Sequence, residues 1–192
     1  MVDASSENKR HIALIGFMGA GKSCVARELA KRYGCDRIDL DDYIEEMAGK
    51  SVADIFQQDG EQRFRQMELD ALHAALDYPA TTQVKPKATI IACGGGTVTN
   101  PESLALLRQG AVIVYLAVQP ERALARINDW TTRPLLTQAG SVDAVYALAQ
   151  SRLALYEAAS DISVNTDKRD IDEVADCVVT RLREAGYARL LA

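Results

Sequence analysis

A glycine-rich segment near the N-terminus constrains the fold of this chain more than any other stretch. Residues 16–23 read GFMGAGKS, which has the spacing G-x-x-x-x-G-K-S. The apolar run 12–15 precedes it as a buried strand would, and 24–33 follows with the apolar spacing of a helix. This order places backbone N–H groups and a helix N-terminus around one concavity that suits phosphate. The alternative, a chance match in a glycine-containing turn, is disfavoured by the flanking elements.

The segment therefore predicts a nucleotide site. Lys22 is expected to reach the β- and γ-phosphates, and the Ser23 hydroxyl to hold Mg²⁺. The loop residues predicted to bind the nucleotide are Gly19, Ala20, Gly21, Lys22, Ser23 and Cys24. Such a loop indicates a nucleotide but does not identify the reaction.

Composition narrows the class of protein. A chain of 192 residues with 48% apolar and 26% charged residues fits one globular domain, residues 1–192. The net charge of −5 gives no global attraction to nucleic acid or to a membrane surface. No apolar stretch reaches the roughly 18 residues of a membrane span, and residues 1–9 have the polar composition of a loose tail. With its four cysteines scattered and expected to be free, we predict a cytoplasmic protein without nucleic-acid or membrane partners.

Strand-like and helical patterns alternate along the chain. Strands are predicted at 12–15, 36–39, 89–92, 111–118 and 162–164. Helices are predicted at 24–33, across 41–78 with breaks near 49–50 and 59–60, and at 101–109, 120–127, 142–159 and 171–182. This alternation predicts an α/β protein with a five-stranded parallel sheet flanked by helices. Its ligand is expected across the carboxyl ends of the strands.

Two acids near the second strand are candidates for phosphoryl-transfer chemistry. Asp39 and Asp41 stand two residues apart, which points both side chains the same way if the strand persists. One carboxylate can then organise the waters of Mg²⁺, while the other holds a hydroxyl and accepts its proton. The alternative is that the acids merely favour the N-terminus of the following helix.

Four arginines and a glycine turn complete the candidate set. Arg65 and Arg152 are candidates to bind a carboxylate through the two-pronged guanidinium group, and Glu68 is placed to orient Arg65. The alternative is that both are ordinary solvent-exposed arginines on helices. The turn 94–96, which includes Gly95 and Gly96, allows a close backbone approach to a ligand or is simply flexible.

The remaining two arginines lie near or within the loop 128–140. Arg126 precedes the loop and Arg133 lies in it; a lid closing there would bring Arg133 onto the developing charge, unless this is an ordinary basic surface loop.

Taken in order, these segments resemble the shikimate kinase family across nearly the whole chain. The segments that carry the resemblance are GFMGAGKS at 16–23, DLD at 39–41, SVADIFQQDGEQRFRQME at 51–68, CGGGTV at 93–98, RPLL at 133–136 and RLALYEAAS at 152–160. The resemblance implies a P-loop kinase fold like that of nucleoside monophosphate kinases. It also implies a phosphate-loop core at 10–39, a substrate-binding segment at 40–78 and a lid at 128–140.

The resemblance also implies an activity and roles for the residues. A monomeric enzyme would transfer the γ-phosphate of ATP, with Mg²⁺, to the 3-hydroxyl of shikimate on the way to aromatic amino acids. Lys22, Asp41 and Arg133 would be catalytic, Ser23 and, through water, Asp39 would serve the metal, and Arg126 would stack on the adenine. The acid would be held by Asp41, Arg65, Gly95, Gly96 and Arg152.

Some positions depart from the family pattern. Leu40 stands between the two acids where Thr or Ser is more usual, Cys93 precedes the glycines, and Ser160 replaces a small apolar residue. The loop 81–87 is also somewhat long. These differences leave open a sister P-loop kinase that acts on another small hydroxy acid or amino acid. A nucleoside monophosphate kinase and a non-catalytic nucleotide switch are less favoured, because neither a base-recognition segment in 41–78 nor an N-K-x-D motif is present.

Overall fold

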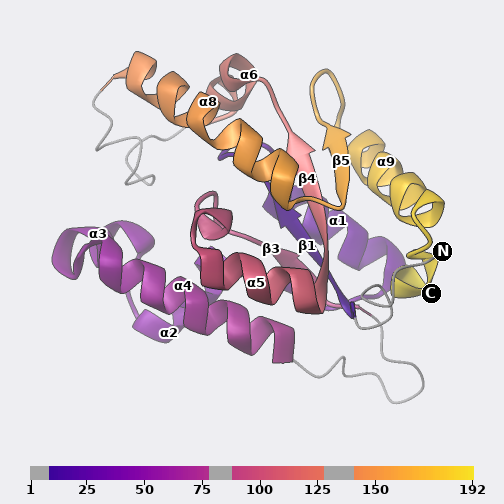
Figure 1. Cartoon of the computed structure of the whole chain (residues 1–192), viewed down its shortest axis with the longest axis horizontal. Helices are drawn as coiled ribbons and strands as arrows, with labels where there is room; N and C mark the ends of the chain where they lie inside the picture. Colours follow the sequence, from indigo (N-terminus) through magenta and orange to yellow (C-terminus); the bar gives the residue numbers. More distant parts are fainter. Residues whose placement is uncertain (1–8, 78–87, 128–140) are drawn as a thin grey trace.

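A five-stranded parallel sheet forms the centre of the protein (Figure 1). In the computed structural model, residues 9–77, 88–127 and 141–192 are described. The strands are β1 (His11–Ile15), β2 (Arg37–Asp39), β3 (Ile90–Ala92), β4 (Ala111–Ala117) and β5 (Ile162–Asn165). They lie in the order β2-β3-β1-β4-β5, and every neighbouring pair is parallel. The predicted sheet is confirmed, and all its carboxyl ends meet at one edge.

The helices occur where the apolar spacing predicts them, within one residue except at the start of α1 and the ends of α6 and α9, which each differ by two residues. They are α1 (Lys22–Tyr33), α2 (Leu40–Ala48), α3 (Val52–Gln58), α4 (Gly60–Asp77), α5 (Pro101–Gly110), α6 (Pro120–Ala125), α8 (Val142–Ala159) and α9 (Ile171–Glu184). Two short 3₁₀ helices, η2 (Thr97–Thr99) and η3 (Ala188–Leu191), complete the described elements.

Helices cover both faces of the sheet, which explains why the strands are so apolar. All five residues of β1 are buried, as expected for a strand covered on both sides. Helices α1 and α9 pack against each other on one face, and α5 lies against β4 on the other. Arg108 of α5 donates to the Ala158 carbonyl of α8 over 3.2 Å, so these two helices are neighbours on that second face.

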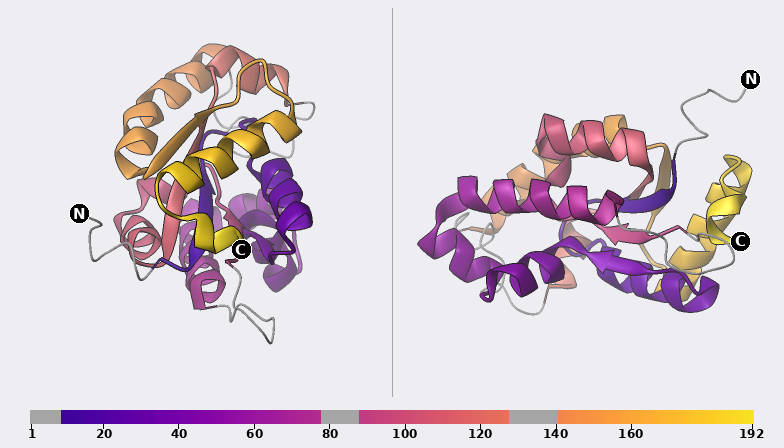
Figure 2. Two further views of the ribbon diagram at one scale, coloured as in Figure 1. Left: turned by 90° about the vertical axis from the view of Figure 1, so that its right-hand side faces the viewer. Right: turned by 90° about the horizontal axis from the view of Figure 1, so that it is seen from below.

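Residues 40–77, which follow β2, form three helices that lie at the opposite end of the molecule from α9 (Figure 2). The breaks between these helices have local causes. Gly49 ends α2 with a left-handed φ of 65°, and the Ser51 side chain caps the start of α3. Helix α4 then packs against α2, α3 and α5, which fixes its first turns next to the carboxyl edge of the sheet.

Three parts of the predicted organisation lie outside the described residues. They are the N-terminal tail except Lys9, the loop 81–87 and the predicted lid at 128–140. Within the described ranges, no helix combines the length and the apolarity that a membrane crossing requires.

His11 is a buried titratable group at the start of β1. Its Nε2 lies 3.0 Å from the Leu76 carbonyl, which makes Nε2 the donor and leaves Nδ1 as an unprotonated acceptor. Nδ1 is buried and has no hydrogen-bond partner among the described residues. Burial therefore lowers the pKa of His11 below its ordinary value of 6.5, with a smaller contribution in the same direction from Arg10.

This shift predicts a loss of stability in mild acid. Below pH 6.5 the unfolded chain binds a proton at His11 more readily than the folded protein, so the unfolding free energy falls as the pH drops. Denaturant unfolding between pH 7.5 and 5 should show this fall, and His11→Gln should reduce it. His73, which is exposed on α4, provides the control His73→Gln, expected to follow the parent protein. Equal pH dependence in all three proteins would show that His11 is not the titrating group.

Candidate active site

A cavity of about 800 Å³ opens at the carboxyl edge of the sheet. Its volume lies within the range of small-molecule sites, which is roughly 300–1,000 Å³. Most of the predicted site residues line it: Gly19, Ala20, Gly21, Lys22, Ser23, Cys24, Asp39, Asp41, Arg65, Gly95, Gly96 and Arg126. Residues from β2, from α1 and α4, and from the loops that follow β1 and β3 are far apart in sequence but meet at this one edge.

The loop between β1 and α1 has the conformation that the glycines allow. Gly19 and Gly21 have φ values of 78° and 91°, in the left-handed region that L side chains rarely adopt. A Cβ at Gly19 would collide with the backbone of Ala123, so the loop is also pressed against α6. Helix α1 begins at Lys22 without a side-chain cap and without an acidic residue in its first turn. Its first N–H groups therefore suit an anion at the cavity.

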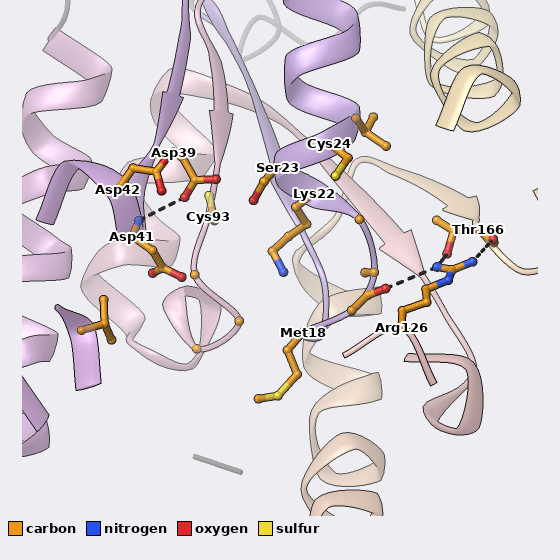
Figure 3. A pocket seen from close by; sticks show the side chains of 18 of the residues that line it. Met18, Lys22, Ser23, Cys24, Asp39, Asp41, Asp42, Cys93, Arg126 and Thr166 are labelled. Atoms are coloured by element: carbon orange, nitrogen blue, oxygen red, sulfur yellow. Dashed lines mark hydrogen bonds between the residues drawn. The ribbon is translucent and has the colours of Figure 1, made fainter. Parts of the chain in front are cut away.

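Lys22 lies at the centre of this cavity, with Ser23 beside it (Figure 3). Its Nζ donates to the carbonyls of Gly16 at 2.9 Å and Phe17 at 3.1 Å. The ammonium is thus held against the loop itself, within the same concavity as the N-terminus of α1. Figure 3 shows Asp39 and Asp41 on one side of Lys22 and Arg126 on the other.

The reason predicted for the alignment of Asp39 and Asp41 is wrong. Strand β2 ends at Asp39, and α2 begins at Leu40, so the two acids do not share a strand face. Asp39 is instead the N-cap of α2, and its Oδ1 accepts from the Asp41 backbone N–H over 3.2 Å. The helix turn, rather than strand alternation, brings both carboxylates to the cavity. The helix-start alternative was correct for both acids, because Asp39 is the N-cap of α2 and Asp41 lies in its first turn, and it does not remove either acid from the site.

Arg65 is held in place by carboxylates of its own helix. Its Nη1 donates to Glu68 over 2.8 Å and its Nη2 to Glu61 over 3.0 Å, as the i+3 position of Glu68 predicts. Glu68 is only 1% exposed and also accepts from the Thr97 hydroxyl over 2.6 Å. A buried carboxylate needs such partners, and the bond from Thr97 ties α4 to the residue that follows the glycine turn. Arg65 also lies over the ring of Phe64, 5.4 Å from its centroid.

The glycine turn between β3 and η2 is held in place by hydrogen bonds from α8. The Gly95 carbonyl accepts from Arg152 Nη1 over 3.1 Å and from the Tyr156 hydroxyl over 2.5 Å. Arg152 is 8% exposed and is not among the described residues that line the cavity. The structure thus brings Arg152 to the glycine turn, while Gly95 and Gly96 form the surface that faces the cavity.

Arg126 links three segments at the other end of the cavity. Its Nη1 donates to the Gly19 carbonyl over 3.3 Å and to the Thr166 hydroxyl over 3.1 Å, and its Nη2 donates to the Thr166 carbonyl over 2.8 Å (Figure 3). Ile171, at the start of α9, lines the cavity and is 39% exposed. An exposed apolar side chain and a planar guanidinium are suitable contacts for an aromatic base.

The buried thiol of Cys93 is excluded as a nucleophile. Burial raises the pKa of Cys93, and the charge of Glu68 adds to the rise, so the thiol stays protonated. Phe56 and Phe64 pack with their ring planes tilted by 41° and their centroids 4.7 Å apart, and they give the cavity an apolar wall.

Some predicted positions lie away from the site or outside the description. Arg133 and its lid loop lie outside the described residues. Leu40 is fully buried and does not line the cavity, and Ser160 is the C-cap of α8. Of the departures in described residues, only Cys93 contacts the cavity. No group of three or more His, Cys, Asp or Glu side chains in the described ranges forms a metal site.

Three residues of the site were not singled out from the sequence. Thr97 and Thr166 are fully buried, and Tyr156 is 1% exposed, yet each donates or accepts at the cavity wall. Their partners are separated from them by 29, 40 and 61 positions in sequence. The only available signal was the placement of Thr97 directly after the glycines and of Tyr156 four residues after Arg152.

Comparison with known proteins gives one consistent family. The family model described as "Shikimate kinase" matches residues 18–183. A shikimate kinase from Dehalococcoides mccartyi is 40% identical over 92% of this chain and 95% of its own length. One from Xanthomonas axonopodis pv. citri is 36% identical over 90% and 91%.

Solved structures agree with the sequence matches. A shikimate kinase from Acinetobacter baumannii in complex with shikimate superposes with a TM-score of 0.83 and 29% identity, covering 94% of this chain and 97% of that one. A deoxyadenosine kinase from M. mycoides has a TM-score of 0.52 at 17% identity, over 91% and 98% of the two chains, and shares the fold alone.

The tight packing around the glycine turn predicts a difference between two adjacent substitutions. A Cβ at Gly96 would lie 2.5 Å from Arg65 Nη1, so Gly96→Ala must displace the guanidinium from the position in which it donates to the buried Glu68. We expect a loss of about 1–3 kcal/mol in unfolding free energy. A Cβ at Gly95 meets nothing closer than 3.7 Å, so Gly95→Ala should lie within about 0.5 kcal/mol of the parent protein. Denaturant titration of both variants measures this; equal stabilities would contradict the described contact.

Proposed function

The chain belongs to the shikimate kinase family, and from that premise we propose how its cavity transfers the γ-phosphate of ATP to the 3-hydroxyl of shikimate. The family is that of ATP-dependent kinases that phosphorylate shikimate on the route to aromatic amino acids. One observation carries the assignment of roles. The phosphate loop and the Arg65–glycine-turn wall line the same cavity, so a nucleotide and a small acid can meet there.

ATP would occupy the half of the cavity formed by residues 19–24. The uncapped N-terminus of α1 and the Lys22 ammonium would hold the phosphates. The base would lie towards Arg126 and Ile171, where a guanidinium plane and an apolar side chain are available. Arg126 is already fixed by Gly19 and Thr166, so its position does not depend on the nucleotide.

The residues around the loop fit a magnesium ion. Ser23 and Asp39 both line the cavity and present oxygen atoms, the ligands that Mg²⁺ prefers. With few protein ligands in reach, the ion would be held mainly by the phosphates, by Ser23 and, through water, by Asp39. When bound, it neutralises charge on the transferring phosphoryl group.

Shikimate would occupy the half of the cavity formed by Asp41, Arg65 and the glycine turn. Its carboxylate is planar, and a guanidinium fork pairs with such a group through two parallel hydrogen bonds. Arg65 faces the cavity for this role, and Arg152 lies behind the glycine turn. Backbone N–H groups of Gly95 and Gly96 would add donors, and Asp41 would accept from a ring hydroxyl.

Transfer then requires alignment more than strong covalent chemistry. The 3-hydroxyl oxygen attacks the γ-phosphorus as the bond to the β–γ bridging oxygen breaks, and Asp41 takes the hydroxyl proton. Lys22 and, with the lid, Arg133 would stabilise the charge on the leaving and transferring groups. The protein supplies positions for two substrates within one cavity.

We extend the proposal to the oligomeric state and the cellular location of the protein. Every residue assigned a role lies in one chain, which fits a monomer that acts on small molecules alone. The described cysteines are free, and ATP is an intracellular substrate, which fits the cytoplasm.

An assay of ADP release tests directly whether shikimate is the phosphoryl acceptor. With Mg·ATP present, ADP formation should depend on added shikimate, and hydrolysis without it should be slow. A panel of other small hydroxy acids and amino acids serves as the comparison. If another acid were the better acceptor, the phosphoryl chemistry would stand and the shikimate assignment would not.

Loss of Arg65 should weaken binding of the acid and leave binding of the nucleotide nearly unchanged. Arg65→Ala removes a charge-assisted pair with the carboxylate, so we expect the KM for shikimate to rise by about 10- to 100-fold. The KM for ATP should change less than about twofold. Arg63→Ala is the matched control, because Arg63 is an exposed arginine on the same helix. An unchanged KM for shikimate in Arg65→Ala would remove Arg65 from the acid site.

Loss of Lys22 should lower kcat, the rate constant of turnover. Lys22→Ala removes a cation from the phosphates, and we expect kcat to fall by about 100- to 1,000-fold. Lys31→Ala, at an exposed lysine in the last turn of α1, should keep the parent kcat. Steady-state kinetics with saturating shikimate measures both. A Lys22→Ala enzyme with parent kcat would contradict the role of the loop.

A further inference from the structure

The Gly95 carbonyl is the acceptor for two donors of the same helix. The Tyr156 hydroxyl donates to it over 2.5 Å and Arg152 Nη1 over 3.1 Å. The two residues are four positions apart on α8, which places them on one helix face. Both are buried, so neither donor competes with bulk water for this carbonyl.

Tyr156 is fixed in this position by packing. It is 1% exposed, and its ring stacks on that of Tyr115 in β4 with centroids 5.3 Å apart and planes at 21°. Burial raises the pKa of Tyr156 to about 12, against the opposing charge of Arg152. The phenol therefore keeps its proton at physiological pH and remains a donor.

Holding the Gly95 carbonyl also sets the direction of the next N–H group. A trans peptide unit is planar, so its oxygen and the following N–H point in opposite directions. With the Gly95 oxygen turned towards α8, the Gly96 N–H is turned away from it. Three consecutive glycines have little conformational preference of their own, and an external constraint is needed to keep one orientation.

The structure separates the Tyr156 hydroxyl from the surface that would bind the acid. Gly95 and Gly96 line the cavity, whereas Tyr156 and Arg152 are not among the described lining residues. When a carboxylate binds Arg152, it competes with the Gly95 carbonyl for the guanidinium. The Tyr156 hydroxyl has no such competitor from the acid and can hold the carbonyl throughout.

We propose that Tyr156 is a positioning residue for the acid substrate: its hydroxyl holds the Gly95 carbonyl, and so aims the Gly96 N–H, while Arg152 engages the carboxylate. This inference rests on the proposed function, because it needs the acid at Arg65, Arg152 and the glycine turn. It assigns Tyr156 no contact with either substrate.

Removing the hydroxyl alone tests this role. Tyr156→Phe keeps the stacked ring, and we expect shikimate to bind about 5- to 20-fold more weakly, with the KM for ATP within about twofold. Tyr115→Phe removes the hydroxyl from the other ring of the stacked pair and should leave both constants unchanged. Calorimetric titration of shikimate and steady-state kinetics measure both variants beside the parent protein.

The outcomes are distinct. Selective loss of shikimate affinity in Tyr156→Phe supports the inference, whereas unchanged affinity, or equal weakening of ATP, overturns it. A parent enzyme that does not phosphorylate shikimate would instead overturn the proposed function.

A measurement on the parent protein avoids dependence on folding of the variant. The Tyr156 hydroxyl proton should exchange slowly with water and give a resolved NMR signal. In Tyr156→Phe this signal should vanish and the Gly96 amide resonance should shift, while Tyr115→Phe preserves both. A Tyr156 hydroxyl proton that exchanges freely in the parent protein would also overturn the inference.

Discussion

The pairing of β1 with β3 is the constraint on which the site depends. Leu14 is in register with Ala92, and the Cys93 N–H donates to the Leu14 carbonyl over 3.0 Å. Both strands run in the same direction, so the phosphate loop and the glycine turn leave the sheet side by side. Neither turn could recognise two substrates alone, but their adjacency makes one cavity from two segments about 75 residues apart.

Glu68 extends this constraint to the helical segment. Burying a carboxylate that is only 1% exposed costs free energy unless the carboxylate is paired. Glu68 has one partner in α4 and one in η2. Arg65 comes from its own helix, and Thr97 from the residue after the glycines. The position of the arginine therefore depends on the same turn that β3 places beside the phosphate loop. Acid recognition and nucleotide recognition thus share one scaffold.

Local pattern was sufficient to predict the fold, and most of the residues that it singled out line the cavity. Residues 16–23 have the spacing of a phosphate-binding loop, and the strands are apolar because both sheet faces are covered. Pattern failed where one residue decided the geometry: β2 ends at Asp39, so a helix turn and not a strand face presents Asp41. It also failed for Tyr156 and Thr166, since a hydrogen bond to a partner 61 or 40 positions away leaves no periodic signal.

Identification of the product tests the central claim most directly. The enzyme incubated with Mg·ATP and shikimate should give one phosphate ester for each ADP, with ³¹P NMR showing phosphorus coupled to the ring proton at carbon 3. That result requires both substrates in the one cavity with the 3-hydroxyl aligned on the γ-phosphorus. Release of inorganic phosphate without an ester, or an ester at another hydroxyl, would contradict the proposed arrangement of Asp41, Arg65 and the phosphate loop.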